Sequence, residues 1–290
     1  MIRVDRGWSQ TLGAALTMFL AALTAWAPAA TGAPSEAAEW NRRPWGRFGI
    51  GSWKQVRVFT ETLGQNGQVE SLDTKEIKTT LDRVDDWGYR LKVEVTMEVA
   101  GKRFQAEPKY VAQGFYGESP GQTAALKSLG TGDVTICGRR YPCQIRQVTV
   151  NGEGTSKTST LHCSDQTAPY VLKSETKASD AQGVSYESWV EVLAVEMPSK
   201  VLTEIKPSAL VSTVHKQRGG TSSVTIEVHC IDVPGHVVSH TSKELDAEGR
   251  VVRRSTLELV DYEVRNPAPE TSRVLVKKRL FQHLRARAQW

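Results

Sequence analysis

The sequence lacks the motifs by which most cofactor-dependent enzymes are recognised. It contains no phosphate-binding loop, no dinucleotide-binding glycine motif and no Cys-x-x-Cys-His haem attachment. No pair of carboxylates stands out either, because Glu and Lys alternate with apolar residues in stretches such as 92–95. We therefore expect a protein that is not an enzyme and that binds no cofactor and no metal.

One short match to a catalytic motif is present, at residues 117–121. The sequence Gly-Glu-Ser-Pro-Gly has the Gly-x-Ser-x-Gly spacing of a nucleophile elbow, with Ser119 in the nucleophile position. In that motif the residue after the serine donates its backbone N–H to the oxyanion, and Pro120 has no N–H to donate. The match does not predict a hydrolase.

Long hydrophobic runs are absent after residue 33. The apolar run at residues 12–23 follows Arg3 and Arg6 and precedes small residues around Ala29 and Ala33, which is the plan of a secretory signal peptide. A retained anchor helix is the alternative, but it needs about 20 strongly apolar residues, and this run is shorter and rich in Ala. No cysteine directly follows the run, so lipidation is not indicated. We expect residues 1–33 to be removed and the protein to be exported to the periplasm or outside the cell, and soluble.

Cysteine is scarce, with four residues: Cys137, Cys143, Cys163 and Cys230. Export makes an oxidising compartment the expected one, and an even number of cysteines allows two disulfides in three connectivities. Counting outward from the turn at residues 151–154 places Cys143 opposite residue 162. A pairing of Cys143 with Cys163 then needs only a one-residue slip, and it is the disulfide we favour.

Period-two alternation of apolar residues dominates the chain from Trp53 onward. It predicts half-buried antiparallel strands separated by turns rich in Gly and Asn. Only residues 121–129 look helical. The fold class we predict is mainly β, with two related antiparallel β-sheet units built from repeated hairpins and one short helix between them.

An internal repeat supports this organisation. Thr155-Ser156, His162-Cys163, Pro169 and residues 180–183 recur 65 to 67 residues later as Thr221-Ser222, His229-Cys230, Pro234 and residues 246–249. Asp in the first position and Gly in the fourth are typical of type I turns, so we interpret Asp180 and Asp246 as turn builders. A fainter third copy starts at Asp85.

The predicted domain boundaries follow from these signals. Residues 1–33 are the signal peptide, 34–48 an extended leader, 49–120 the first β unit, 121–265 the second β unit and 266–290 a basic C-terminal tail. The hairpin repeat occupies about 143–197 and 210–264 of the second unit.

The histidines invite a metal interpretation, because imidazole and thiolate are good ligands for zinc or copper. However, adjacent residues on a strand point to opposite faces, so a His-Cys pair cannot chelate one ion without a bulge. His236 and His240 would lie about 13 Å apart along a strand at roughly 3.3 Å per residue. We expect these histidines to lie on the surface.

Positive charge is concentrated at the C-terminus. The formal charge is +5, of which residues 1–33 contribute +1 from Arg3, Arg6 and Asp5, and residues 273–290 contribute +6 with no acid, which leaves −2 for residues 34–272. The folded body is therefore slightly acidic, and no nucleic-acid partner is expected. The basic tail predicts contact with an anionic envelope surface, although a solvated extension is the alternative. The contact residues would be Arg273, Lys277, Lys278, Arg279, Arg285 and Arg287.

Several local patterns resemble those of exported bacterial β-repeat proteins. These patterns are residues 51–53, which open a strand, residues 138–143, which form a turn, and residues 233–238, which precede an Asp-x-x-Gly hairpin. The run of long antiparallel hairpins over about residues 50–264 is also similar in architecture to the sheet of periplasmic lipoprotein carriers of the LolA and LppX type. That resemblance implies a concave sheet that holds acyl chains. It carries no diagnostic motif and assigns no functional residue.

Two functions remain open on the sequence alone. The first is a non-catalytic exported binding protein that holds an apolar or amphiphilic ligand, such as a lipid, on a curved antiparallel sheet. The alternative is a structural or adaptor protein of the cell envelope, which binds protein or an anionic polymer through sheet edges and the basic tail.

Overall fold

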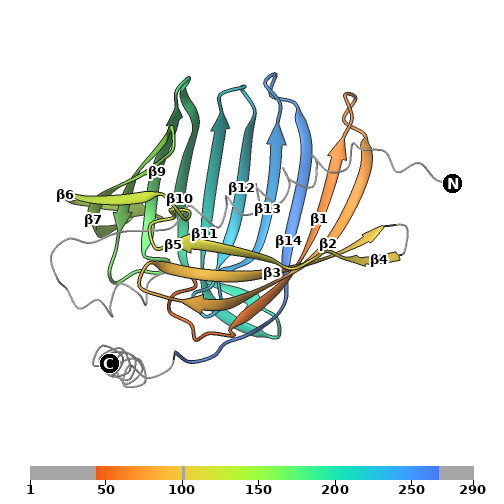
Figure 1. Cartoon of the computed structure of the whole chain (residues 1–290), viewed down its shortest axis with the longest axis horizontal. Coiled ribbons are helices and arrows are strands. Elements are labelled where there is room, and N and C mark those ends of the chain that lie inside the picture. Colours follow the sequence, from red (N-terminus) through yellow and green to blue (C-terminus); the bar gives the residue numbers. More distant parts are fainter. Residues whose placement is uncertain (1–43, 100–101, 268–290) are drawn as a thin grey trace, which may run out of the picture.

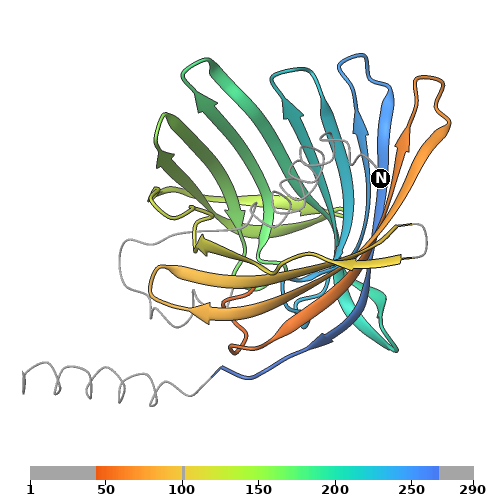
Figure 2. The same cartoon turned by 45° about the vertical axis from the view of Figure 1, so that its right-hand side comes forward.

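The computed structural model describes residues 44–99 and 102–267, and these residues form one antiparallel sheet of 14 strands. The sheet is strongly curved (Figures 1 and 2). Strands β10 to β13 stand upright, while β3 and β5 run across them nearly horizontally. The strands are β1 (Trp53–Leu63), β2 (Val69–Val84), β3 (Gly88–Val99), β4 (Lys102–Gln105), β5 (Lys109–Gly114), β6 (Thr123–Ile136), β7 (Arg139–Gly152), β8 (Thr155–Cys163), β9 (Val171–Asp180), β10 (Gly183–Val201), β11 (Glu204–Gln217), β12 (Ser222–His229), β13 (Val237–Leu245) and β14 (Val251–Glu263).

The strand order is that of an antiparallel meander in which the first strand pairs with the last, and the edges of the sheet lie at β4 and β5 on one side and at β6 on the other. Strands that are consecutive in the sequence pair from β1 to β4 and from β6 to β14, and β14 pairs with β1. Strand β3 pairs with β4 near its end and with β5 near its start. The connection from β5 to β6 therefore carries the chain from one edge region of the sheet to the other.

The alternation on β1 shows why these residues form strands. Lys54, Val56 and Val58 are buried, while the residues between them are half-buried on the opposite face. On that outer face Arg57 Nη2 lies 2.9 Å from Glu76 Oε1 of β2, as expected for a solvated face carrying cross-strand ion pairs. The period of two thus separates a buried face from a charged face.

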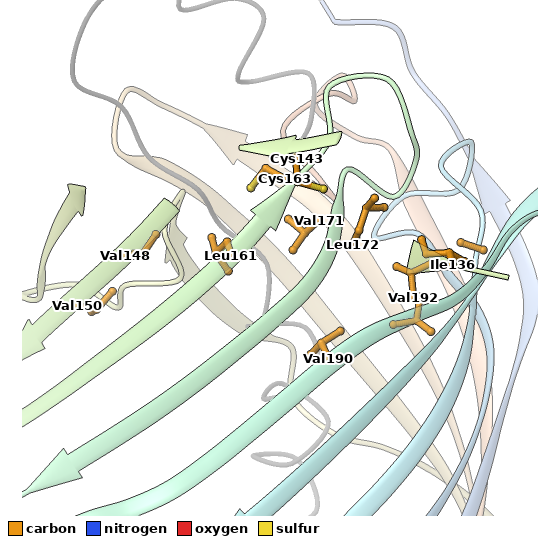
Figure 3. Packing of buried hydrophobic residues seen from close by; sticks show 12 residues of the cluster. Ile136, Cys143, Val148, Val150, Leu161, Cys163, Val171, Leu172, Val190 and Val192 are labelled. Atoms are coloured by element: carbon orange, nitrogen blue, oxygen red, sulfur yellow. The ribbon is translucent and has the colours of Figure 1, made fainter. Parts of the chain in front are cut away.

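Buried apolar side chains form two main clusters at the two ends of the sheet. The first, which we call the β6–β11 cluster, contains Val148, Leu161, Val190 and Val211 and is drawn in Figure 3. The second, the β1–β3 cluster, contains the residues Trp45, Phe48, Val56, Val58, Ile77, Leu81, Tyr89, Leu91, Val93, Phe115, Val237 and Leu257.

The β6–β11 cluster is buried because the sheet bends at this end, so that β6 contacts β10. Ile136 at the end of β6 packs in the same cluster as Val192 of β10. The neighbouring Cys137 Sγ lies 3.3 Å from the carbonyl oxygen of Leu193. Strands β6 and β10, which are not neighbours in the sheet, are thereby brought together.

The prediction of a short helix at residues 121–129 is wrong. Most of this stretch belongs to β6, where Ala124 pairs with Val150 and Leu126 with Val148 of β7. Ala and Leu have high helix propensity, but here alternate residues are half-buried against the cluster and the pairing with β7 decides the conformation. No residue in the described ranges is helical.

The two predicted sheet units are one hydrogen-bonded sheet. Strands β1 and β14 pair from Trp53 opposite Glu263 to Thr62 opposite Arg253, so residues of the first predicted unit continue directly into the second. Turn chemistry and strand alternation predict hairpins, but they contain no information on which distant strands pair.

The Asp-x-x-Gly turns form as predicted. Asp180 joins β9 to β10 and accepts a hydrogen bond from the backbone N–H of Gln182 at 2.8 Å. Asp246 joins β13 to β14 and accepts one from the N–H of Arg250 at 2.8 Å. Both aspartates are turn residues.

No helix within residues 44–99 and 102–267 is long and apolar enough to span a membrane. The predicted signal peptide, part of the leader and most of the basic tail lie outside these residues.

Candidate functional site

We call the buried face of the sheet the inner face. A group of polar side chains lies on this face between the two apolar clusters. One row of paired residues crosses this face from β1 to β11. It begins with Val58 opposite Leu257 and ends with Glu227 opposite Val211. Between them, His240 pairs with both Leu257 and Glu227. An acid and a histidine therefore lie in the middle of an otherwise apolar row.

These two residues belong to a buried polar cluster, defined here as Lys54, Glu227, His229, His236 and His240. Glu227 and His229 are 4% and 5% exposed, and Glu227 Oε2 lies 2.8 Å from His229 Nε2. Lys54 is buried on β1, and its Nζ donates a hydrogen bond to the carbonyl oxygen of Val237 at 3.1 Å. Burial of charged groups is costly, so such a cluster is unusual in a sheet core.

His236 is the most deeply buried member, at 1% exposure. It lies in the loop between β12 and β13 with a φ of 61°, and neither ring nitrogen has a hydrogen-bond partner. Unpaired buried polar atoms are rare in folded proteins, and each calls for an explanation such as a bound group.

The charges in this cluster act on one another. Burial lowers the pKa of Lys54 to about 8, although the charge of Glu227 opposes this shift. Burial by itself would raise the pKa of Glu227, but the hydrogen bond and charge of His229, with the charges of His240 and Lys54, bring it below its ordinary value. Near pH 7 Lys54 is thus mostly an ammonium and Glu227 a carboxylate.

The remaining histidines near Glu227 are neutral at that pH. Burial, with the charges of His229, Arg47 and Lys54, puts the pKa of His236 well below its ordinary value. Burial also lowers the pKa of His240 and of His215 on β11. Acidification therefore adds positive charge to a site that water solvates poorly.

A row of hydroxyl groups crosses the inner face two residues along the strands from Glu227. Thr60, Ser255, Ser242, Thr225 and Thr213 are consecutive cross-strand partners on β1, β14, β13, β12 and β11. Thr225 Oγ1 donates to Ser242 Oγ at 2.9 Å. We call this set the hydroxyl row. It lies roughly 7 Å from the row that contains Glu227.

The sequence analysis missed the polar cluster, and its prediction of surface histidines is wrong for His229 and His236. On β12 the apolar residues Val224, Ile226 and Val228 alternate with Glu227 and His229, which suggests the opposite orientation. Pairing with β11 and β13 turns Glu227 inward and leaves Ile226 37% exposed. Register in a sheet sets the face of every residue on a strand, so one strand can violate its own hydrophobic pattern.

Within residues 44–99 and 102–267, no group of three or more His, Cys, Asp or Glu side chains is arranged to hold a metal ion. His162, Cys163, His229 and Cys230 do not come together as one ligand set. The absence of a cofactor remains an expectation from the sequence.

Cys143 and Cys163 are both buried in the β6–β11 cluster and lie close together in Figure 3. Gln144 is the partner of Cys163, so Cys143 is offset from it by one position. No disulfide joins the four cysteines, all of which lie in the part of the chain described here. Burial raises the pKa of the Cys143 thiol. The Cys143–Cys163 disulfide remains a prediction for the protein in an oxidising compartment.

Ser119 is exposed in the connection between β5 and β6, and the strands on either side belong to an antiparallel sheet. The strand–turn–helix context of a nucleophile elbow is missing at this position. The six basic residues expected to contact an anionic surface, Arg273, Lys277, Lys278, Arg279, Arg285 and Arg287, lie outside the described residues.

No protein-family model matches the chain, and no curated protein matches it. Two solved structures are similar at 9% identity. One is a Bacteroides fragilis protein described as exported with a YmcC-like fold, which matches over 74% of this chain and 98% of its own with a TM-score of 0.30. The other is a Vibrio parahaemolyticus domain described as an outer membrane lipoprotein-sorting protein, over 77% and 88% with a TM-score of 0.33. The second is of the class to which the sequence resemblance pointed, but similarity this weak carries no conclusion about function.

Proposed function

We propose that this chain is an exported, non-catalytic protein that binds an amphiphilic ligand on the inner face of its curved sheet. The observation that supports this proposal is the composition of that face. Two apolar clusters flank a polar cluster, and the hydroxyl row runs beside it. Apolar area supplies the free energy of binding for a lipid-like ligand, at about 25 cal/mol per Å². A few fixed polar groups then orient it.

The single-layer architecture also favours this function. The strands described here that share more than a few close contacts are hydrogen-bonded neighbours, together with β6 and β10, and no helix packs on the inner face within residues 44–99 and 102–267. An apolar sheet face must be covered by something, either by curvature of the sheet or by another molecule. Export, expected from residues 1–33, would place the protein where it meets envelope lipids.

Native mass spectrometry tests this proposal on protein purified from its own cell envelope, under conditions that preserve weak complexes. We expect a population heavier than the processed chain, with an amphiphile recovered on extraction. Protein delipidated with organic solvent and refolded is the control, and it should regain the added mass when envelope lipids are returned. Purification of only the ligand-free mass, with no regain, would contradict the proposal.

A second function, that of an envelope adaptor, is supported by the charge of the tail. Residues 273–290 carry +6, whereas residues 34–272 carry −2. The edge strand β6 also presents the exposed side chain of Leu129. In this alternative the tail contacts an anionic polymer or membrane and the sheet edges contact protein.

A further inference from the structure

The polar cluster contains hydrogen-bond donors that have no acceptor. Lys54 can donate three hydrogen bonds and accepts none, and the contact to Val237 uses one of them. His236 adds a neutral ring with two unpartnered nitrogens, one of which carries a proton. The one carboxylate in the cluster, Glu227, is bonded to His229 and makes no hydrogen bond to Lys54. Two donors of Lys54 and the N–H of His236 therefore lack an acceptor.

The charges give the same result. The titratable groups that act on the site come from the segment before β1, from β1, from β11, from β12, from the loop after it and from β13. They are Arg47, Lys54, His215, Glu227, His229, His236 and His240. Lys54 and Glu227 carry opposite charges near pH 7, and Arg47, half-buried in the segment before β1, brings the net charge of the surroundings to at least +1. An anion that accepts from the free N–H groups of Lys54 would neutralise this excess positive charge.

Apolar residues lie directly beside these donors. Val56 and Val58 follow Lys54 on the same face of β1, and Leu257 pairs with Val58. All three belong to the β1–β3 cluster, which also contains Val237, the residue whose carbonyl accepts from Lys54. A ligand with an acidic end and a hydrocarbon chain would match this arrangement of donors and apolar surface.

We propose that Lys54 and His236 bind the oxyanion headgroup of a single-chain amphiphile, whose hydrocarbon chain lies along the inner face of β1 and β14. This inference rests on the proposed function and specifies the chemical class of the ligand. The headgroup chemistry is that of a carboxylate or a doubly ionised phosphate monoester, both of which accept hydrogen bonds and donate none.

Calorimetric titration of the full-length processed protein near pH 7 tests the inference with three probes: laurate, dodecyl phosphate and dodecanol. These share a twelve-carbon chain and differ in the headgroup. We expect the two anions to bind at least about tenfold more tightly than dodecanol, which corresponds to a charged hydrogen bond. The ratio of laurate to dodecyl phosphate affinity then distinguishes a carboxylate from a phosphate ligand.

Variants separate the headgroup contact from the fold. Lys54→Met should lower the affinity for laurate about tenfold and leave that for dodecanol unchanged, whereas Lys54→Arg should keep the preference for anions. His236→Phe replaces the imidazole with a somewhat larger ring that has no polar atom, and it should weaken the binding of both anions by a smaller factor. Lys92→Met is the matched control, because it removes one positive charge from the opposite face of β3.

The outcomes distinguish the two proposals. If dodecanol binds as tightly as laurate, or if folded Lys54→Met binds laurate like the unsubstituted protein, the headgroup site is wrong while amphiphile binding stands. If none of the three probes binds, amphiphile binding itself is contradicted. In that case an ordered water would be the better explanation for the unpaired nitrogens of His236.

Discussion

At the scale of single residues, the most informative feature is a lysine in a sheet core. Lys54 is an inner-face residue of β1, followed on the same face by Val56 and Val58. The negative charge of Glu227 favours the charged form of this lysine, whereas burial disfavours it. Buried charges that contribute little to stability are frequently retained for function. Replacement of Lys54 therefore tests two things: its effect on the free energy of unfolding and its effect on ligand affinity.

The lowered pKa of Lys54 should make the stability of the protein depend on pH. Its pKa is about 8 in the folded protein, against 10.5 for an ordinary lysine, so between these values the unfolded chain holds more protons than the folded one. The free energy of unfolding should therefore rise with pH across this window, by on the order of 3 kcal/mol from this group. Below about pH 8 both states are protonated and the contribution levels off.

Urea denaturation of the unsubstituted protein and of Lys54→Met at pH 7.5 and pH 10 measures this difference. Other groups that titrate in the window affect both proteins, so the quantity of interest is the gap between their unfolding free energies. That gap should shift in favour of the unsubstituted protein as the pH rises. Parallel behaviour of the two proteins would mean that Lys54 is not buried as a charged group.

At the scale of elements, β6 shows how sheet pairing overrides local preference. Residues 121–129 have a sequence pattern that predicts a helix, yet β6 pairs with β7 along its length. The pairing has a register shift between Ser128 and Gly130. Gly130 has a φ of 112°, a conformation that other residues rarely adopt. The glycine permits the bulge that lets this edge strand continue after the irregularity.

Two glycine substitutions test this role of Gly130. A Cβ added at Gly130 or at Gly219 meets no atom within 4 Å, but only Gly130 has a positive φ. Gly130→Ala should therefore lower the free energy of unfolding by about 1–3 kcal/mol because of backbone strain. Gly219→Ala should leave it unchanged or raise it by less than about 1 kcal/mol. Thermal or chemical denaturation of the two variants compares them, and equal effects would argue against a bulge at Gly130.

At the scale of the whole molecule, charge and apolar surface are arranged separately. The inner face of the sheet carries the apolar clusters, the outer face carries ion pairs such as Arg57 with Glu76, and the excess positive charge lies in residues 273–290. The net positive charge of the whole chain therefore describes the tail rather than the folded body.

Removal of residues 273–290 tests the function of this separation. We expect the truncated protein to keep its far-UV circular dichroism and its affinity for laurate, and to lose binding to vesicles that contain anionic phospholipid. Vesicles of neutral phospholipid are the control and should bind neither protein. If the truncated protein binds anionic vesicles as tightly as the full chain, the folded body makes that contact. The tail then has no part in an adaptor function.

Features that depend on near neighbours in the chain could be predicted before the fold was known. Period-two alternation identified strands such as β1, and Asp-x-x-Gly spacing identified the turns at Asp180 and Asp246, because a turn and its flanking strands are set by a few adjacent residues. The mainly β fold class and the charge of the tail follow directly from such local information.

Features that depend on pairing between distant segments became visible only in the folded chain. It joined β1 to β14 in one sheet, made residues 123–136 a strand, and turned Glu227 and His229 of β12 toward the inner face. The physical reason is that hydrogen-bonded neighbours set the register, and register sets the face of each side chain, even where the hydrophobic pattern of one strand points the other way. The polar cluster at Lys54 exists only because β1 meets the hairpin of β12 and β13, which lies far from it in the sequence.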